Sequence, residues 1–221
     1  MPADRSPLRR AQPAVAPDRA AGAHLRFIRE TMARTGTFTA VPGWGGVAMG
    51  ATALGAAALA ELQPTAAGWL SVWAGEALVG VTIGLWSTTA KARRSGAALL
   101  SGQGRKFVLG LLPALAVGVA LTLAVWGVEV GTTAETYARK GVASSVSLAL
   151  MPGLWLLCYG AGVTSAGAFS VRLVPIMGTC FMLAGALALL APAAWANAFM
   201  AAGFGGLHVV FGALIVRNHG G

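Results

Sequence analysis

Long apolar runs, separated by short polar or charged segments, dominate the chain after residue 40. Each run is close to the ~20 residues that a helix needs to cross ~30 Å of hydrocarbon. We place the predicted membrane-spanning helices at residues 41–61, 66–89, 107–128, 142–164, 171–191 and 194–216. The connections at 62–65 and 192–193 are so short that the first two helices, and the last two, are expected to form antiparallel hairpins. The pattern therefore predicts an all-α polytopic membrane bundle of six transmembrane helices over residues 41–217.

The chain before this bundle follows a different pattern. Residues 1–23 are rich in Ala, Pro and Arg and have no apolar periodicity, which predicts a disordered basic tail. In residues 24–40, Leu25, Ile28 and Met32 recur at helical spacing with arginines between them. This spacing predicts an amphipathic segment lying on the membrane surface. A solvated linker is the alternative for this segment.

Composition supports the membrane class. Only 10% of the 221 residues are charged and 56% are hydrophobic, whereas a soluble domain carries about 25% charged residues. The chain also has 31 glycines, and small residues let the backbones of spanning helices approach each other closely. Sets of small residues with the spacing expected at close helix contacts are Gly46/Gly50, Gly80/Gly84 and Gly110/Ala114/Gly118.

Lys and Arg residues are divided unevenly between the two sides of the predicted bundle. Of the 16, 14 fall on one side and 2, Arg139 and Lys140, on the other. The 14 are Arg5, Arg9, Arg10, Arg19, Arg26, Arg29, Arg34, Lys91, Arg93, Arg94, Arg105, Lys106, Arg172 and Arg217. By the positive-inside rule both termini are predicted to be cytoplasmic (N-in/C-in). Topology and attraction to the anionic lipid bilayer then explain the net charge of +9, and no nucleic-acid partner is predicted.

Glu76 places a carboxyl group inside the second predicted helix, about 15 Å from its outer end at ~1.5 Å per residue. A bare charge is costly at that depth, so we expect Glu76 to be protonated, paired or in contact with a polar cavity. One interpretation is a proton-titrating or cation-binding site. The other is a neutral acid that hydrogen-bonds to a neighbouring helix and holds the bundle together.

His208 lies in the sixth predicted helix, about 20 Å from its outer end. This depth allows a Glu76–His208 pair within helix tilt. A single histidine in a spanning helix is more often a structural hydrogen-bonding group than a functional one. Glu76 and His208 together are therefore the candidate intramembrane polar site.

Other chemistry finds little support in the sequence. Cys158 and Cys180 both lie in apolar runs and are predicted to be small core residues rather than a disulfide. No residues have metal-ligand spacing within one helix, and no cofactor is predicted. Zinc-protease, phosphate-loop and nucleotide-binding motifs are absent from the sequence, so we predict that the protein is not an enzyme.

Several short motifs connect the chain to known proteins. They are Ile28-Arg-Glu-Thr-Met-Ala-Arg34, Lys91-Ala-Arg-Arg94, Tyr159-Gly160, Gly203-Phe-Gly-Gly-Leu-His208 and Phe211-Gly212. Through these motifs residues 25–217 resemble a bacterial family of uncharacterised six-helix integral membrane proteins. Its members are often encoded beside a winged-helix transcriptional regulator, which implies a regulatory or stress-linked context. The family has no established activity, so the resemblance assigns no functional residues.

Two function hypotheses follow. The leading one is an integral inner-membrane protein with a regulatory or accessory role, acting through contacts with lipid, with further copies of itself or with a co-encoded regulatory protein. The alternative is a small proton-coupled transporter that uses an intramembrane Glu76/His208 pair.

Overall fold

The computed structural model describes residues 21–28, 38–95, 102–129 and 144–220, and the chain divides into two units, Met1–Gly36 and Thr37–Gly221. In the first unit, residues 21–28 form a helix with exposed apolar side chains at Leu25, Phe27 and Ile28. The rest of the predicted tail, and the predicted amphipathic segment from residue 29 to residue 37, lie outside the described residues.

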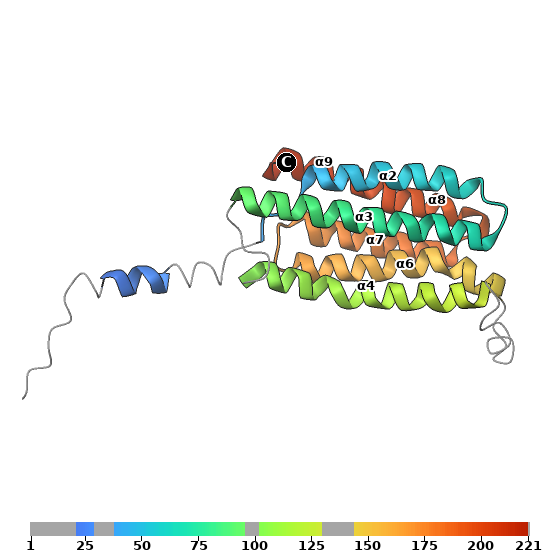
Figure 1. Ribbon diagram of the computed structural model, residues 1–221, viewed down its shortest axis with the longest axis horizontal. Helices are drawn as coiled ribbons and strands as arrows, with labels where there is room; N and C mark the ends of the chain where they lie inside the picture. Colours follow the sequence, from blue (N-terminus) through green and yellow to red (C-terminus); the bar gives the residue numbers. More distant parts are fainter. Residues whose placement is uncertain (1–20, 29–37, 96–101, 130–143, 221) are drawn as a thin grey trace, which may run out of the picture. The chain divides into compact units, whose positions relative to one another are not determined.

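The second unit is built from long helices that pack against one another (Figure 1). Its elements are α2 (Gly43–Glu61), α3 (Ala66–Ser95), α4 (Gly102–Glu129), α6 (Ser144–Gly167), α7 (Leu173–Leu190), η1 (Ala193–Trp195), α8 (Ala196–Met200), η2 (Ala201–Leu207) and α9 (His208–His219). The last four run on without a gap as Ala193–His219, which we call the C-terminal helix. With this helix, the described part of the chain has six helices that are long and apolar enough to cross a membrane. Within the described residues the fold is all-α, as predicted.

The helix boundaries agree with the predicted spans within a few residues at most ends. The largest differences are in α3, which continues to Ser95, and in α4, which begins at Gly102. Both helices run past their apolar stretches because Lys and Arg are good helix formers. At the other end of α3, Thr65 acts as the N-cap, since its Oγ1 accepts a hydrogen bond of 3.1 Å from the Gly68 N–H. The α2–α3 pair and the pair formed by α7 and the C-terminal helix are both in contact, as expected for hairpins.

Glycines bring α2 and the C-terminal helix into backbone contact. A Cβ added at Gly46 would lie 3.2 Å from Gly212 Cα, and one added at Gly50 would lie 2.6 Å from Gly205 O. Any larger side chain at these positions would force the two helices apart. The close contact predicted for Gly46 and Gly50 is confirmed.

Glycines also bring the backbones of α6 and α7 into close contact. A Cβ at Gly160 would lie 2.7 Å from Gly178 O, and one at Gly185 would lie 2.9 Å from Gly153 O. The glycines are seven residues apart on each helix, which places both of them on one face. The two helices therefore meet along most of their length.

Helices α3 and α4 are the least enclosed of the six. In their most apolar stretches 11% and 6% of the residues are buried, whereas the other four spans have between 28% and 44%. Of the predicted glycine contacts here, Gly110 does pack, against the backbone of Ala166, but a Cβ at Gly80 or Gly118 would meet no described atom within 4 Å. The prediction is wrong at Gly80 and Gly118 because spacing alone does not say which face of a helix a neighbour covers.

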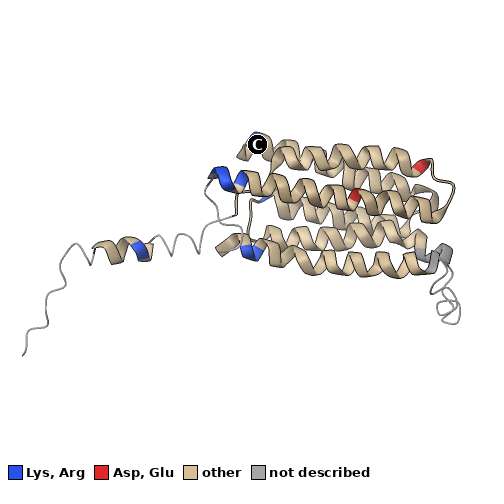
Figure 2. Cartoon of the chain, in the orientation of Figure 1, with Lys and Arg blue, Asp and Glu red and all other residues tan. Residues whose placement is uncertain are grey.

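Positive charge gathers at one end of this unit (Figure 2). All the described Lys and Arg residues of the unit lie there, where α3 and α9 end and α4 and α7 begin: Lys91, Arg93, Arg94, Arg105, Lys106, Arg172 and Arg217. Glu61 lies at the opposite end of α2. These residues share one end as predicted, while Arg139 and Lys140 lie outside the described residues. We call this the basic end.

Lys91 ties three segments together at the basic end. Its Nζ donates to Val41 O at 3.1 Å, to His219 O at 3.2 Å and to Gly220 O at 2.7 Å. The ammonium group thereby binds carbonyls at the end of α9 and one just before α2. Charge-assisted hydrogen bonds of this kind are stronger than neutral ones.

The residues just before α2 are part of the bundle. Phe38 is 5% exposed, its N–H donates to Phe169 O at 2.8 Å, and its ring centroid lies 4.9 Å from that of Phe107. Ala40 is also buried. The last residues of the segment 24–40 therefore lie inside the second unit rather than on its surface.

Candidate functional site

Glu76 and Thr52 form a polar pair between two of the long apolar helices. Thr52, the central residue of α2, donates from Oγ1 to Glu76 Oε1 on α3 at 2.8 Å. The same hydroxyl lies 3.0 Å from Met49 O and 3.2 Å from Ala48 O. A hydroxyl carries one proton, so when it donates to a helix carbonyl, Glu76 keeps its contact only by donating a proton of its own. The pair can therefore accommodate both the charged and the neutral carboxyl group.

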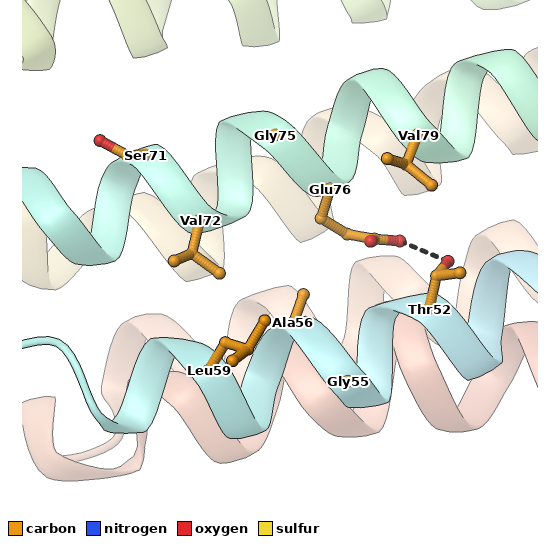
Figure 3. A pocket seen from close by; sticks show the side chains of 9 residues that line it. All are labelled: Thr52, Gly55, Ala56, Leu59, Ser71, Val72, Gly75, Glu76 and Val79. Carbon is orange, nitrogen blue, oxygen red and sulfur yellow. Dashed lines mark hydrogen bonds between the residues drawn. The ribbon is translucent and has the colours of Figure 1, made fainter.

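The pair opens on a shallow groove between α2 and α3 (Figure 3). The groove has a volume of about 410 Å³ and is lined by Thr52, Gly55, Ala56, Leu59, Ser71, Val72, Gly75, Glu76 and Val79. Figure 3 shows the Glu76 side chain pointing toward Thr52, while Ser71 points away and donates to Ala67 O of its own helix at 2.6 Å. Because Glu76 is only half-buried and most of the lining is apolar, the groove is a surface feature and not a polar internal cavity.

His208 and Tyr159 form a second polar pair, on different helices. The Tyr159 OH lies 2.7 Å from His208 Nε2, and His208 Nδ1 lies 2.9 Å from Phe204 O. A carbonyl can only accept, so Nδ1 carries the proton and, in the neutral ring, Nε2 accepts from the tyrosine hydroxyl. His208 is 4% exposed. Both ring nitrogens are thus satisfied inside the bundle.

Aromatic rings enclose this second pair. The Tyr159 ring centroid is 4.8 Å from that of Phe181 and 5.3 Å from that of Phe204. The Phe181 ring is also 5.2 Å from the His208 ring. We call these four residues the aromatic cage. Its packing leaves the polar pair in an apolar surrounding, where a lost hydrogen bond is costly.

The local backbone before His208 is unusual. Ala201–Leu207 forms a π-helix, a rare conformation that often occurs at functional sites. A Cβ at Gly203, in this segment, would meet the Cδ2 atom of Leu156 on α6, so a larger residue here would require that leucine side chain to shift. Phe204 lies in this π-helix and His208 follows it directly, so two of the residues that contact Tyr159 come from this segment.

The structure does not bring Glu76 and His208 together. Both residues are described, each has its own partner on another helix, and no hydrogen bond joins them. An apolar cluster on α2, α3 and the C-terminal helix includes Trp73 and Phe204, whose rings are 6.5 Å apart. Equal depth allowed the predicted pair, but Glu76 faces the outer groove while His208 faces α6.

Sequence reasoning found Glu76 and His208 and missed their partners. The signal that could have found Thr52 and Tyr159 is the rule that polar groups in an apolar span need a hydrogen-bonding partner. Threonine and tyrosine hydroxyls are too frequent for that rule to choose among them without a structure.

The remaining candidates give no further site. Cys158 and Cys180 are free and half-buried, so the prediction that they form no disulfide is confirmed. In the part of the chain that the structure describes, no three His, Cys, Asp or Glu side chains are grouped as metal ligands.

Comparison with known proteins leaves the family open. No family model, curated protein or solved structure matches this chain. The resemblance to six-helix bacterial proteins therefore stays a prediction, and the function has to be argued from the two polar pairs.

Proposed function

We propose that the chain is a multi-pass protein of a bacterial inner membrane, with both termini in the cytoplasm, and that it has a regulatory or accessory role. It acts by binding other proteins in the plane of the membrane and not by catalysis. Six apolar helices support the membrane location. The charge at the basic end supports the orientation, because Lys and Arg are retained on the cytoplasmic side.

The observation that carries the accessory role is the position of Glu76. Its carboxyl group lies at the level of the middle of α2, yet it opens on the outside of the bundle. A polar group on the lipid-facing side of a spanning helix is costly unless another polar group meets it. Polar side chains at such positions commonly hold helices of membrane assemblies together.

Photo-crosslinking in intact membranes tests the accessory role. A photoreactive amino acid at Leu59 or Val79, on the rim of the groove, is expected to give protein adducts. The matched control is Leu183 on α7, which is 61% exposed and outside the groove. Equal labelling at Leu183, or the absence of adducts from both rim positions, would contradict the proposal.

Cysteine labelling tests the orientation separately. In a chain carrying Cys158→Ala and Cys180→Ala, Glu61→Cys is expected to react with a membrane-impermeant maleimide added outside the cell. Arg94→Cys at the basic end is expected to react only after the membrane is permeabilised. The reverse pattern would overturn the orientation without bearing on the groove.

The resemblance also suggests a cytoplasmic partner, a co-encoded regulatory protein. Such a protein would meet the N-terminal segment and the basic end. Co-purification with the full-length chain, compared with a chain lacking residues 1–23, is the measurement. We expect the deletion to reduce recovery of the regulator. Unchanged recovery would show that residues 1–23 do not contribute to binding it.

Proton-coupled transport is the second candidate, and one observation favours it. The Thr52 hydroxyl can hydrogen-bond to Glu76 in either protonation state, as a proton-binding site requires. Glu76→Gln would then abolish proton-driven uptake in vesicles while leaving the folded protein intact. His208 would not share the site, since its hydrogen bonds are made in the aromatic cage.

A further inference from the structure

Glu76 has hydrogen-bonding capacity that its own chain leaves unused. In the described structure its single hydrogen bond is the one from Thr52 to Oε1. Among the described residues none donates to the second carboxyl oxygen, and a hydrocarbon surrounding offers no donor. A polar group left without a partner in an apolar surrounding is costly, so this carboxyl group favours contact with a further hydrogen-bonding group.

The groove beside it can admit a helix. A Cβ added at Gly55 or at Gly75 would meet nothing within 4 Å, so the surface is open at both glycines. Around them, Leu59 and Val79 are 57% and 43% exposed and form apolar rims. Small residues beside a polar side chain, flanked by apolar ones, are typical of contacts between spanning helices.

The depth of Glu76 favours a second copy of the chain as the occupant. Copies in one membrane share one orientation, so a two-fold axis runs along the membrane normal and residues near it meet their own counterparts at the same depth. A neutral carboxyl group has one donor and one acceptor and is complementary to itself. With the two-fold axis beside the groove, Glu76 of a second copy therefore supplies the missing hydrogen-bonding partner at the same depth.

We infer that the α2–α3 groove is the interface of a parallel homodimer, in which the two Glu76 carboxyl groups hydrogen-bond to each other across the two-fold axis. The inference rests on the proposed function, in which the chain binds another protein in the membrane, and it identifies that protein as a second copy of the chain. In the dimer each Thr52 holds its own Glu76 in place, so that the side chain is already ordered before the second copy binds. Val72 and Val79 lie on the same face of α3 as Glu76, at spacings of four and three residues, and would pack around the pair.

Disulfide crosslinking locates the interface. In the Cys158→Ala/Cys180→Ala chain, Val79→Cys is expected to give a dimer on a non-reducing gel after mild oxidation in membranes. Leu183→Cys on α7 is the control and is expected to stay monomeric. A dimer from Leu183→Cys but not from Val79→Cys would overturn the inference.

Substitution of Glu76 tests the chemistry. Fluorescence energy transfer between labelled copies in lipid vesicles, measured as the protein is diluted with lipid, gives the dissociation constant. Glu76→Ala is expected to raise it at least tenfold, whereas Glu76→Gln is expected to leave it within about threefold, because a carboxamide also has both donor and acceptor. Equal loss in both variants would exclude the hydrogen-bonded pair.

A groove-filling variant provides the second test. Gly75 is exposed and a Cβ added there meets nothing within 4 Å, so Gly75→Leu is expected to fold in the single chain while energy transfer is lost. Tryptophan fluorescence of the folded protein is the control for folding. Retained energy transfer in folded Gly75→Leu would place the dimer interface elsewhere.

The outcomes separate this inference from the proposed function. Adducts at Leu59 and Val79 that contain only a different protein would overturn the homodimer and leave the accessory role standing. The absence of any adduct at both positions would contradict both.

Discussion

Glu76 and His208 both place a polar side chain midway along an apolar helix, but the two regions around them differ. His208 lies in the aromatic cage, and its two nitrogens are satisfied by Tyr159 and Phe204. Glu76 has one partner, Thr52, and opens on a groove at the surface. The closed region has its hydrogen bonds complete, which is what a structural group needs. The open region has capacity left for a partner.

The packing of the two regions differs in the same way. Around the cage, α6, α7 and the C-terminal helix meet through glycines that leave no room for a side chain. On α3, by contrast, a Cβ added at Gly75 or Gly80 would meet no described atom within 4 Å. The closed region should therefore respond strongly to small changes, and the open region should tolerate them in the single chain.

The largest expected effect is from Gly178→Ala on α7. The added Cβ would lie 2.5 Å from Thr164 N and 2.7 Å from Gly160 O, and backbone atoms cannot move aside without separating the helices. We expect a loss of about 3 kcal/mol in the free energy of unfolding, the upper part of the usual range for overpacking. Unfolding by SDS in mixed micelles, followed by tryptophan fluorescence, measures it.

Gly80→Ala on α3 is the matched control. It adds the same methyl group to a spanning helix where nothing lies within 4 Å. The higher helix propensity of Ala makes a small stabilisation of up to about 1 kcal/mol the expected result. If both variants lose the same stability, the two regions do not differ in packing as described.

His208→Leu is expected to have the next largest effect. It removes the acceptor of the Tyr159 hydroxyl in an apolar surrounding, which costs about 1–3 kcal/mol. Tyr159→Phe should cost about 1 kcal/mol by the same reasoning, because the hydrogen bond is lost but the ring is kept. A double-mutant cycle with Tyr159→Phe/His208→Leu measures the coupling between the two side chains. Coupling near zero would mean that the hydrogen bond contributes nothing, and the aromatic packing alone would then hold the cage.

Much of the fold could be predicted from the sequence. Apolar runs of the right length predict the long apolar helices that the described residues form, and the short connection at 62–65 predicts the α2–α3 hairpin. Lys91 and Arg172 are predicted to lie at the same end because successive helices run in opposite directions, which places every second connection on the same side. These features depend on local sequence and on the thickness of the membrane, so no knowledge of tertiary contacts is required.

The site could be predicted only in part. Depth along a helix can be counted from the sequence, so Glu76 and His208 were found. The face of the helix that meets a neighbour cannot be counted in a span that is apolar all round. For that reason the predicted pairing of Glu76 with His208, and the predicted contacts at Gly80 and Gly118, failed together. For Glu76 and Gly80 the outcome depends on how α3 is rotated about its axis, and for Gly118 on how α4 is rotated.

The smallest expected effect is from Thr52→Val, which removes the only described donor to Glu76 and keeps the shape of the side chain. Interhelical hydrogen bonds in membrane proteins contribute about 0.6 kcal/mol on average, and Glu76 can turn toward the groove when its partner is lost. We therefore expect a loss of about 0.6 kcal/mol in the same unfolding assay. Thr82→Val on α3 is the control, since that hydroxyl bonds only to Leu78 O of its own helix, and it should change stability by less. A loss for Thr52→Val as large as that for His208→Leu would show that Glu76, like His208, is a structural group of the bundle, and the open region would then have no capacity reserved for a partner.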